Sequence, residues 1–237
     1  MPLIVLPDTA HDAATNMAID ASLLNSAPKK SAVFRHYNWT EPTITFGYTQ
    51  RINEIRTVAP DNLRLCRRIT GGGIVDHRND WTYALILQFH LKAAQIPATE
   101  LYKMIHHCIQ QALATQSIKT QLAPCPRACG QTPAKPPTGP SQCFVLPAAN
   151  DVLHPDGKKI AGAAMKRTRQ GLLIQGSINR SALPETFDYK ELSNTLPERI
   201  ADRLNLNLSK DTDHLPDQQH IQQERQRFES ADWTNKR

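Results

Sequence analysis

The order of apolar and polar positions along this 237-residue chain predicts strands in its middle and helices at its flanks. Residues 81–89 (WTYALILQF) form an almost continuous apolar run, which is typical of a strand buried on both faces. Shorter runs of β-forming residues predict further strands at 3–6, 32–37, 43–46, 63–69, 74–77, 151–153, 159–166 and 172–178. Turn-forming residues separate most of these segments.

Helical spacing appears in four segments. Apolar residues at helical intervals predict helices over residues 13–24, 99–115 and 189–204, the last interrupted at Pro197, and over residues 216–228. Strands do not alternate with helices in the βαβ manner. The sequence therefore predicts an α+β fold, with largely antiparallel mixed sheets flanked by helices. We expect residues 1–237 to form one domain, with 181–237 as its helical C-terminal segment.

Glycine and proline are concentrated in two places. Three of the ten glycines are consecutive, Gly71 to Gly73, and follow Arg67 and Arg68. A tight turn needs fewer glycines, so this run indicates backbone shaped around a ligand. Six of the seventeen prolines lie between residues 124 and 140. We expect residues 124–142 to be a long, mobile surface loop, the type of segment that is often a lid or binding loop.

Composition excludes several classes of protein. Apolar residues make up 40% and charged residues 21% of the chain, which is ordinary for a globular protein. No apolar run approaches the length of a membrane span, and the N-terminal residues lack a basic region before an apolar one. Together with five cysteines, an odd number, this predicts a cytoplasmic protein with free thiols.

The first three quarters of the chain carry a net positive charge, whereas the remainder carries a net negative one. The net charge is +6, but residues 181–237 carry 8 basic and 11 acidic residues, so the first 180 residues carry +9. Such a body suits an acidic partner, either nucleic acid or an acidic carrier protein. Aromatic residues are only 6% and do not alternate with basic runs, so nucleic acid is the weaker alternative.

Cys143 and Lys159 are the sharpest candidates for chemistry. Cys143 follows the proline-rich segment, and a thiol has an appreciable nucleophilic population near neutral pH. A nearby ammonium would favour its thiolate. Lys159 precedes the small residues 161–164 and is either a solvent-facing lysine or a group that holds a carbonyl or phosphate oxygen. His77 is either a polar member of the site or a turn residue.

A metal site is not expected. Cys125, Cys129 and Cys143 are spaced unlike the ligands of structural zinc, because no second close pair or histidine accompanies them. The three adjacent residues 106–108 (HHC) point in different directions from a helix and cannot chelate together.

Five segments resemble motifs of the lipoate–protein ligase and octanoyltransferase family, in that family's order. They are residues 16–20 (NMAID), 46–50 (FGYTQ), 67–77 (RRITGGGIVDH, with Asp80 and Tyr83 following), 157–164 (GKKIAGAA) and 173–178 (LIQGSI). One match would be weak, whereas five in order are specific.

The resemblance implies a fold like the catalytic domain of biotin and lipoate protein ligases. It also implies a tunnel for a medium-length acyl chain. By resemblance, Cys143 and Lys159 are the catalytic residues, and the substrate-binding residues are Arg68, Thr70, Gly71, Gly72, Gly73, His77, Gly162, Ala163 and Ala164. Ligases of the family use ATP and usually carry a further C-terminal domain. Octanoyltransferases instead use a cysteine and need no cofactor.

The cysteine segment favours the transferase branch. Cys143-Phe144, with Pro147 and Asp151 before the lysine motif, resembles that branch, and fewer than sixty residues follow Ile178. The implied reaction moves octanoate from acyl carrier protein to a lysine of lipoyl domains through a Cys143 thioester. The alternatives are an ATP-dependent lipoate ligase, an amidotransferase acting between lipoyl domains, and a non-catalytic carrier-binding protein.

Three departures from the family pattern concern substrate preference. Ala163 replaces a serine, Met165 replaces a polar residue, and Gln175 stands where histidine is common. The proline-rich insertion before Cys143 is also unusual.

Overall fold

The computed structural model describes residues 1–27, 30–124, 147–210, 216 and 218–236. The proline-rich segment 124–142, apart from Pro124, and Cys143 therefore lie outside the described residues. The strands are β1 (Pro2–Val5), β2 (Thr9–His11), β3 (Ala32–Trp39), β4 (Thr43–Phe46), β5 (Arg64–Arg67), β6 (Val75–Asp76), β7 (Asp80–Gln88), β8 (Gln121–Leu122), β9 (Val152–Leu153), β10 (Lys159–Arg167), β11 (Gly171–Asn179) and β12 (Asn207–Ser209). The helices are α1 (Ala13–Ser26), α2 (Ile52–Arg56), α3 (Lys92–Gln95), α4 (Ala98–Ala114), α5 (Tyr189–Leu204), α6 (Gln218–Glu229) and α7 (Ala231–Thr234), with a 3₁₀ turn, η1 (Arg180–Ala182).

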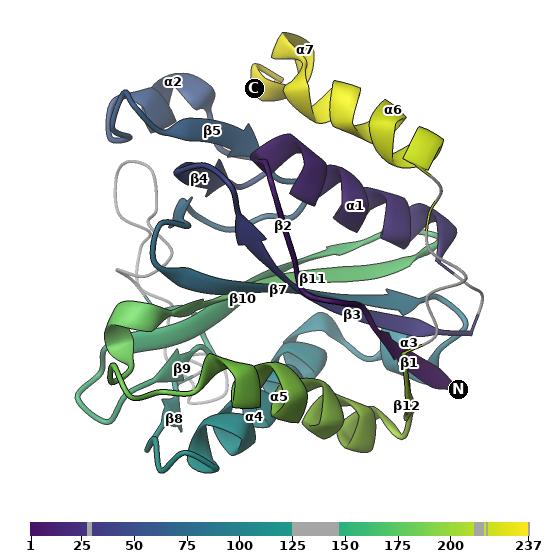
Figure 1. Ribbon diagram of the computed structural model, residues 1–237, viewed down its shortest axis with the longest axis vertical. Coiled ribbons are helices and arrows are strands. Elements are labelled where there is room, and N and C mark those ends of the chain that lie inside the picture. Colours follow the sequence, from purple (N-terminus) through teal and green to yellow (C-terminus); the bar gives the residue numbers. More distant parts are fainter. Residues whose placement is uncertain (28–29, 125–146, 211–215, 217, 237) are drawn as a thin grey trace.

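A large sheet divides the molecule into two layers (Figure 1). Its strand order is β12-β1-β3-β7-β11-β10-β9-β8, and β2 pairs with the end of β3. The pairs from β3 through β8 are antiparallel, whereas β1 is parallel to both β3 and β12. The predicted α+β fold with a largely antiparallel sheet is confirmed.

The central strand β7 is buried along its whole length, as its apolar run predicts. Alternate side chains, including Trp81 and Leu85, join the core beneath α4 and α5. Ala84 and Ile86 point to the opposite face and pack in the core with α1 and Phe228 of α6. Helices cover both faces of this strand, which explains why it carries no polar alternation.

A small sheet lies beside α1, on the same side of the large sheet (Figure 1). Its order is β5-β4-β6, with β4 parallel to β5 and antiparallel to β6. The chain therefore passes from one side of β4 to the other between Arg67 and Val75. The three consecutive glycines lie in this crossing, not in a hairpin between paired strands.

The predicted interruption at Pro197 is wrong, because α5 continues through it. A proline inside a helix costs about 3 kcal/mol in lost hydrogen bonding and steric conflict. Here Leu192, Leu196 and Ile200 are fully buried against the lower core, and Asp188 caps the helix by accepting hydrogen bonds from two backbone N–H groups. Packing and capping outweigh the local defect.

Among the described residues, no helix has the length and apolar content that crossing a membrane requires.

An ion pair ties α1 to the large sheet. Arg35 of β3 is 2% exposed and donates to Asp20 at 2.9 Å and to the side-chain oxygen of Asn16 at 2.9 Å. Asp20 also accepts from the hydroxyl of Tyr37 at 3.0 Å. The pair is buried on both sides, so losing one partner would leave a charge without compensation.

We expect Asp20→Ala to lower the free energy of unfolding by about 3–5 kcal/mol, the usual cost of breaking a buried pair. Denaturant unfolding followed by circular dichroism measures this. Asp76→Asn is the control, because the Asp76–Arg78 pair is exposed and such pairs contribute about 0–1 kcal/mol. Equal losses for the two variants would contradict the structural role given to Asp20.

Candidate active site

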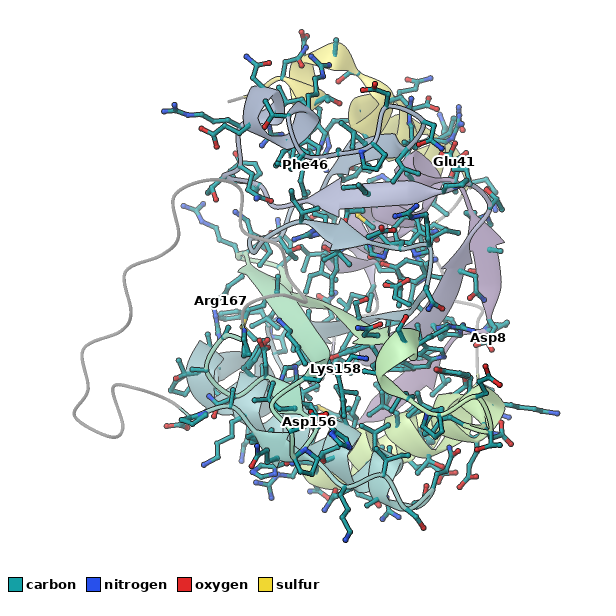
Figure 2. All side chains as sticks on the ribbon, turned by 90° about the vertical axis from the view of Figure 1, so that its left-hand side faces the viewer. Asp8, Glu41, Phe46, Asp156, Lys158 and Arg167 are labelled. Carbon is teal, nitrogen blue, oxygen red and sulfur yellow. The ribbon has the colours of Figure 1, made fainter. Side chains whose placement is uncertain are left out.

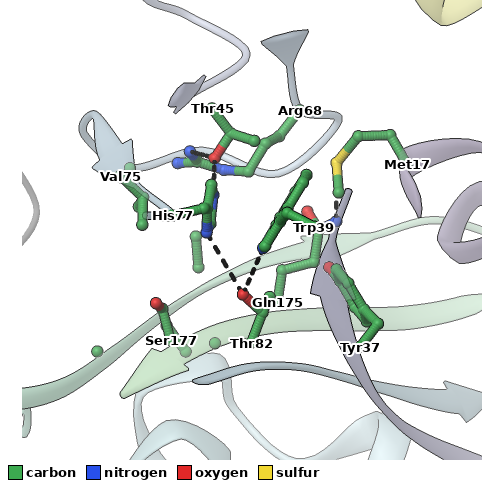
Figure 3. A pocket seen from close by; sticks show the side chains of 15 residues that line it. Met17, Tyr37, Trp39, Thr45, Arg68, Val75, His77, Thr82, Gln175 and Ser177 are labelled. Atoms are coloured by element: carbon green, nitrogen blue, oxygen red, sulfur yellow. Dashed lines mark hydrogen bonds between the residues drawn. The ribbon is translucent and has the colours of Figure 1, made fainter. Parts of the chain in front are cut away.

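A cavity lies between the large sheet, the small sheet and α1 (Figure 3). It contains about 430 Å³ of empty space, part of it open to solvent, and its exposed lining is mostly apolar. The lining residues are Met17, Tyr37, Trp39, Thr45, Arg68, Gly72, Val75, His77, Thr82, Gly162, Ala163, Ala164, Gln175, Gly176 and Ser177.

Small residues of β10 make room for this cavity. Gly162 pairs with Ser177 of β11, which pairs in turn with Thr82 of β7. Ala164 pairs with Gln175 in the next row on the same face. Larger side chains at 162 and 164 would fill the space above the sheet, which gives a physical reason for the small-residue run.

Arg68 holds the glycine segment in shape. Its guanidinium donates to the carbonyl oxygens of Gly71 at 2.8 Å and Gly73 at 2.9 Å, and to the hydroxyl of Thr45 at 2.8 Å. Gly72 between them has φ +86°, which a residue with a Cβ adopts at a cost. Gly47 is required nearby, because a Cβ there would lie 2.1 Å from the carbonyl oxygen of Gly72.

The neighbouring Arg67 points away from the cavity. Its guanidinium donates to the carbonyl oxygens of Tyr48 and Gln50, and to those of Trp233 and Thr234 in α7. The indole N–H of Trp233 donates back to the carbonyl oxygen of Arg67 at 2.9 Å. The two adjacent arginines therefore have different tasks, and only Arg68 lines the cavity.

A second polar network, centred on His77, belongs to the lining of the cavity. The Nδ1 of His77 lies 2.8 Å from a carboxylate oxygen of Asp80, and its Nε2 lies 2.7 Å from the hydroxyl of Thr45. Because a carboxylate only accepts, Nδ1 carries a proton. Trp39 stacks on the His77 ring at 4.1 Å and donates to Thr82 at 2.9 Å (Figure 3). His77 is thus a fixed member of the wall and not a free turn residue.

Gln175 connects the glycine segment to α1. Its side-chain oxygen accepts from the Thr70 hydroxyl at 2.7 Å, and its amide nitrogen donates to Asp20 at 2.7 Å. The glutamine thus uses both ends of its amide to join two elements across the cavity. A histidine at this position would have to contact the same two partners with its two ring nitrogens.

Lys159 lies at the edge of the cavity and is 4% exposed. Its ammonium is 2.7 Å from a carboxylate oxygen of Asp151, which is fully buried. The end of the lysine side chain lies close to Gly162, a lining residue, since a Cβ added there would be 2.6 Å from its ammonium. Of the two alternatives for this lysine, the solvent-facing one is excluded. Its neighbour Lys158 is exposed and lies with Asp156 in the turn that precedes β10. Arg167 lies at the other end of β10 (Figure 2).

The predicted substrate-binding residues converge, but in two groups. Arg68, His77 and the residues 162–164 line the cavity, as does Gly72. Thr70, Gly71 and Gly73 do not line it and instead fix its wall through the bonds to Gln175 and Arg68. Whether any of them binds substrate stays a prediction, and the position of Cys143 lies outside the described residues.

Sequence reasoning missed several residues of this region, because they come from distant segments. They are Met17, Tyr37, Trp39, Thr45, Thr82, Tyr102 and Asp151. A signal existed only for Met17, within the motif at 16–20, and for Asp151, which precedes the lysine motif.

The two described cysteines are unsuited to nucleophilic chemistry. Burial raises the pKa of Cys66 to about 12 and that of Cys108 to about 11, so their thiolates are scarce near neutral pH. In the described ranges, no group of three His, Cys, Asp or Glu side chains could hold a metal ion.

We expect Gly162→Ala to reduce the activity of the site about 100-fold, because misplacing a reacting group by about 1 Å has effects of that size. The added Cβ would lie 2.6 Å from the Lys159 ammonium and 3.1 Å from Asp151, so it must displace the lysine. Initial rates and thermal unfolding would be measured together. Gly157→Ala, in an exposed turn at φ +92°, should show the opposite pattern, with lower stability and an unchanged rate.

Comparison with known proteins agrees with this geometry. The model of the lipoyl protein ligase A/B catalytic domain matches residues 12–203. The chain is 30% identical over 178 residues to octanoyltransferase LipM of Oceanobacillus iheyensis, covering 73% of this chain and 62% of that protein. It is 31% identical over 185 residues to octanoyltransferase LipM of Staphylococcus epidermidis, covering 76% and 66%. The chain thus spans just under two thirds of the length of these two relatives.

The fold is that of lipoate–protein ligases. The solved structure of lipoate-protein ligase A bound with ATP superimposes with a TM-score of 0.76 at 15% identity, over 99% of this chain and 98% of that chain. The family model covers all five sequence motifs, from Asn16 to Ile178. This chain belongs to the family of lipoyl protein ligase A/B catalytic domains.

Proposed function

We propose that this protein is an octanoyltransferase that moves an octanoyl group from acyl carrier protein to a lysine of lipoyl domains. The observation that supports the proposal most directly is the buried ammonium of Lys159 at the edge of a mostly apolar cavity. Membership of the family and the relatives named octanoyltransferase LipM support it. Its partners are the carrier and the lipoyl domain, and the reaction needs no cofactor.

The proposed reaction has two steps. The Cys143 thiolate attacks the thioester carbonyl of the carrier, a tetrahedral intermediate collapses, and the carrier thiolate leaves and takes a proton. The amine of the acceptor lysine then attacks the Cys143 thioester, loses a proton, and releases the Cys143 thiolate. The first step exchanges one thioester for another, and the second forms a more stable amide. No ATP is consumed.

In both steps negative charge develops on the acyl carbonyl oxygen. An ammonium at the edge of the chain-binding cavity would stabilise that charge. The attraction between the two charges is stronger in a site that excludes water. The apolar lining suits the alkyl chain. At about 0.8 kcal/mol for each buried CH₂, burial of an octanoyl chain contributes roughly 5 kcal/mol to binding.

Intact-protein mass spectrometry tests the proposal. The protein is incubated with octanoyl acyl carrier protein without ATP, and we expect one octanoyl adduct that peptide mapping assigns to Cys143. Addition of a lipoyl domain should remove the adduct and acylate one acceptor lysine. A protein that modifies the acceptor only with free octanoate or lipoate and ATP would be a ligase, and the proposal would be wrong. Acylation from an octanoyl lipoyl domain but not from the carrier would instead identify an amidotransferase.

A further inference from the structure

Both oxygens of the carboxylate that pairs with Lys159 accept hydrogen bonds from other groups as well. Asp151 is fully buried, and one of its oxygens receives the Lys159 ammonium at 2.7 Å and the backbone N–H of Ala148 at 2.5 Å. Its other oxygen accepts from the hydroxyl of Tyr102 at 2.6 Å. The direction of this carboxylate is therefore determined by groups other than the lysine.

Tyr102 comes from α4, on the opposite side of the sheet from α1 and the glycine segment. Its hydroxyl oxygen also accepts from the backbone N–H of Ala163 at 2.9 Å and lies 3.0 Å from the Ala163 carbonyl oxygen. Ala163 lines the cavity, so one hydroxyl meets both the lysine's carboxylate and the strand beneath the lysine. Burial and the neighbouring Asp151 raise the pKa of Tyr102, which keeps the hydroxyl a donor.

His106 supports the same arrangement one helical turn later. Its ring lies 4.1 Å from the Tyr102 ring, and its Nδ1 is 2.6 Å from the carbonyl oxygen of Asn150. Asn150 has φ +66°, so the backbone that leads into Asp151 is fixed in an unusual conformation. Burial lowers the pKa of His106 to about 4, and the neutral ring donates one hydrogen bond to this turn.

We propose that Tyr102 and Asp151 are positioning residues for Lys159, and that α4 thereby sets where the ammonium lies over the cavity. Tyr102 orients the carboxylate of Asp151, and the carboxylate orients the ammonium. Asp151 also supplies the negative charge that a buried ammonium needs. The expected change in kcat rests on the proposed function, whereas the expected placement of the Lys159 ammonium does not.

Tyr102→Phe tests the proposal, with Tyr83→Phe as a matched control. Tyr83 is also a buried tyrosine at this end of the sheet, but its hydroxyl has no hydrogen-bond partner among the described residues. We expect Tyr102→Phe to lower kcat for octanoyl transfer roughly ten- to hundredfold with little change in KM. Tyr83→Phe should leave both unchanged. Asp151→Asn, which keeps the shape and removes the charge, should lower kcat at least as far as Tyr102→Phe does.

A second measurement does not depend on transfer activity. Trace acetylation with acetic anhydride, followed by peptide mass spectrometry, reports how accessible each lysine is. Lys159 should be acetylated several times faster in Tyr102→Phe and Asp151→Asn than in the unmodified protein or Tyr83→Phe. Exposed Lys158 is the internal reference and should react equally in all four.

The outcomes separate the two proposals. If the unmodified protein forms no octanoyl adduct, the proposed function fails, and the acetylation ratio still decides the positioning roles. If Tyr102→Phe matches Tyr83→Phe in kcat and in Lys159 acetylation, the positioning role is overturned. A rise in KM alone, or faster acetylation of Lys158 and Lys159 together, also overturns it, because either indicates general loosening. The predicted pattern requires a lower kcat and a selective change at Lys159.

Discussion

Cys143→Ser is expected to abolish the octanoyl adduct and reduce octanoyl transfer to the lipoyl domain to background. A serine hydroxyl is a weak nucleophile unless a dedicated base activates it, whereas a thiol is partly ionised near neutral pH. The two described cysteines cannot substitute, because burial raises the pKa of both Cys66 and Cys108 far above neutrality. Intact-mass measurement and an acceptor assay would follow both steps.

Cys125→Ser and Cys129→Ser are the matched controls, since both belong to the same proline-rich region of the sequence. Each should retain the adduct and most of the transfer rate. Loss of the adduct in either control, with retention in Cys143→Ser, would assign the nucleophile to a different cysteine. Full transfer by all three variants would rule out a cysteine thioester.

Lys159→Met is expected to reduce the transfer rate by a factor on the order of 10²–10³, since removal of one donor to a developing oxyanion has effects of that size. Methionine keeps much of the length and apolar volume of the lysine stem, so the cavity edge should remain filled. Asp151 would lose its ammonium partner and be left as a buried carboxylate, so stability should fall as well. Single-turnover rates of Cys143 acylation and thermal unfolding would be measured on the same samples.

Lys158→Met is the control at the neighbouring position. Lys158 is exposed and its ammonium donates to the carbonyl oxygen of Ser181 at 2.8 Å, away from the cavity residues. This variant should transfer octanoate at close to the normal rate. Similar losses for both variants would indicate that the positive charge of the turn matters, and not the placement of one ammonium.

The sequence carried enough information for the main elements, because their burial is regular. The apolar run at 81–89 and the helical face in 99–115 correspond to β7 and α4 within a few residues. The short elements β2, β8, β12, α2, α3 and α7 were not predicted. Each has two to five residues, too few for a periodic pattern, and exists because a neighbouring strand or turn completes its hydrogen bonds.

The sequence places residues together where they are close along the chain, but not where distant segments meet. Arg68 and the glycines lie within six residues, and one motif contains them all. Tyr102 and Asp151 are 49 positions apart and meet only because α4 packs beneath the end of the sheet. No pattern along the chain marks such a pair, since an isolated tyrosine in an amphipathic helix usually serves packing alone.

The match to the family model ends at residue 203, yet the chain could not be cut there without consequence for the glycine segment. Arg67 immediately precedes Arg68, and its guanidinium is anchored to the backbone of Trp233 and Thr234, almost the last described residues. Removing α7 would take the Trp233 and Thr234 carbonyl acceptors away from a buried cation that directly precedes Arg68, the residue that shapes the cavity wall. Recombinant versions of the protein that trim or tag this terminus are therefore expected to disturb the wall of the cavity.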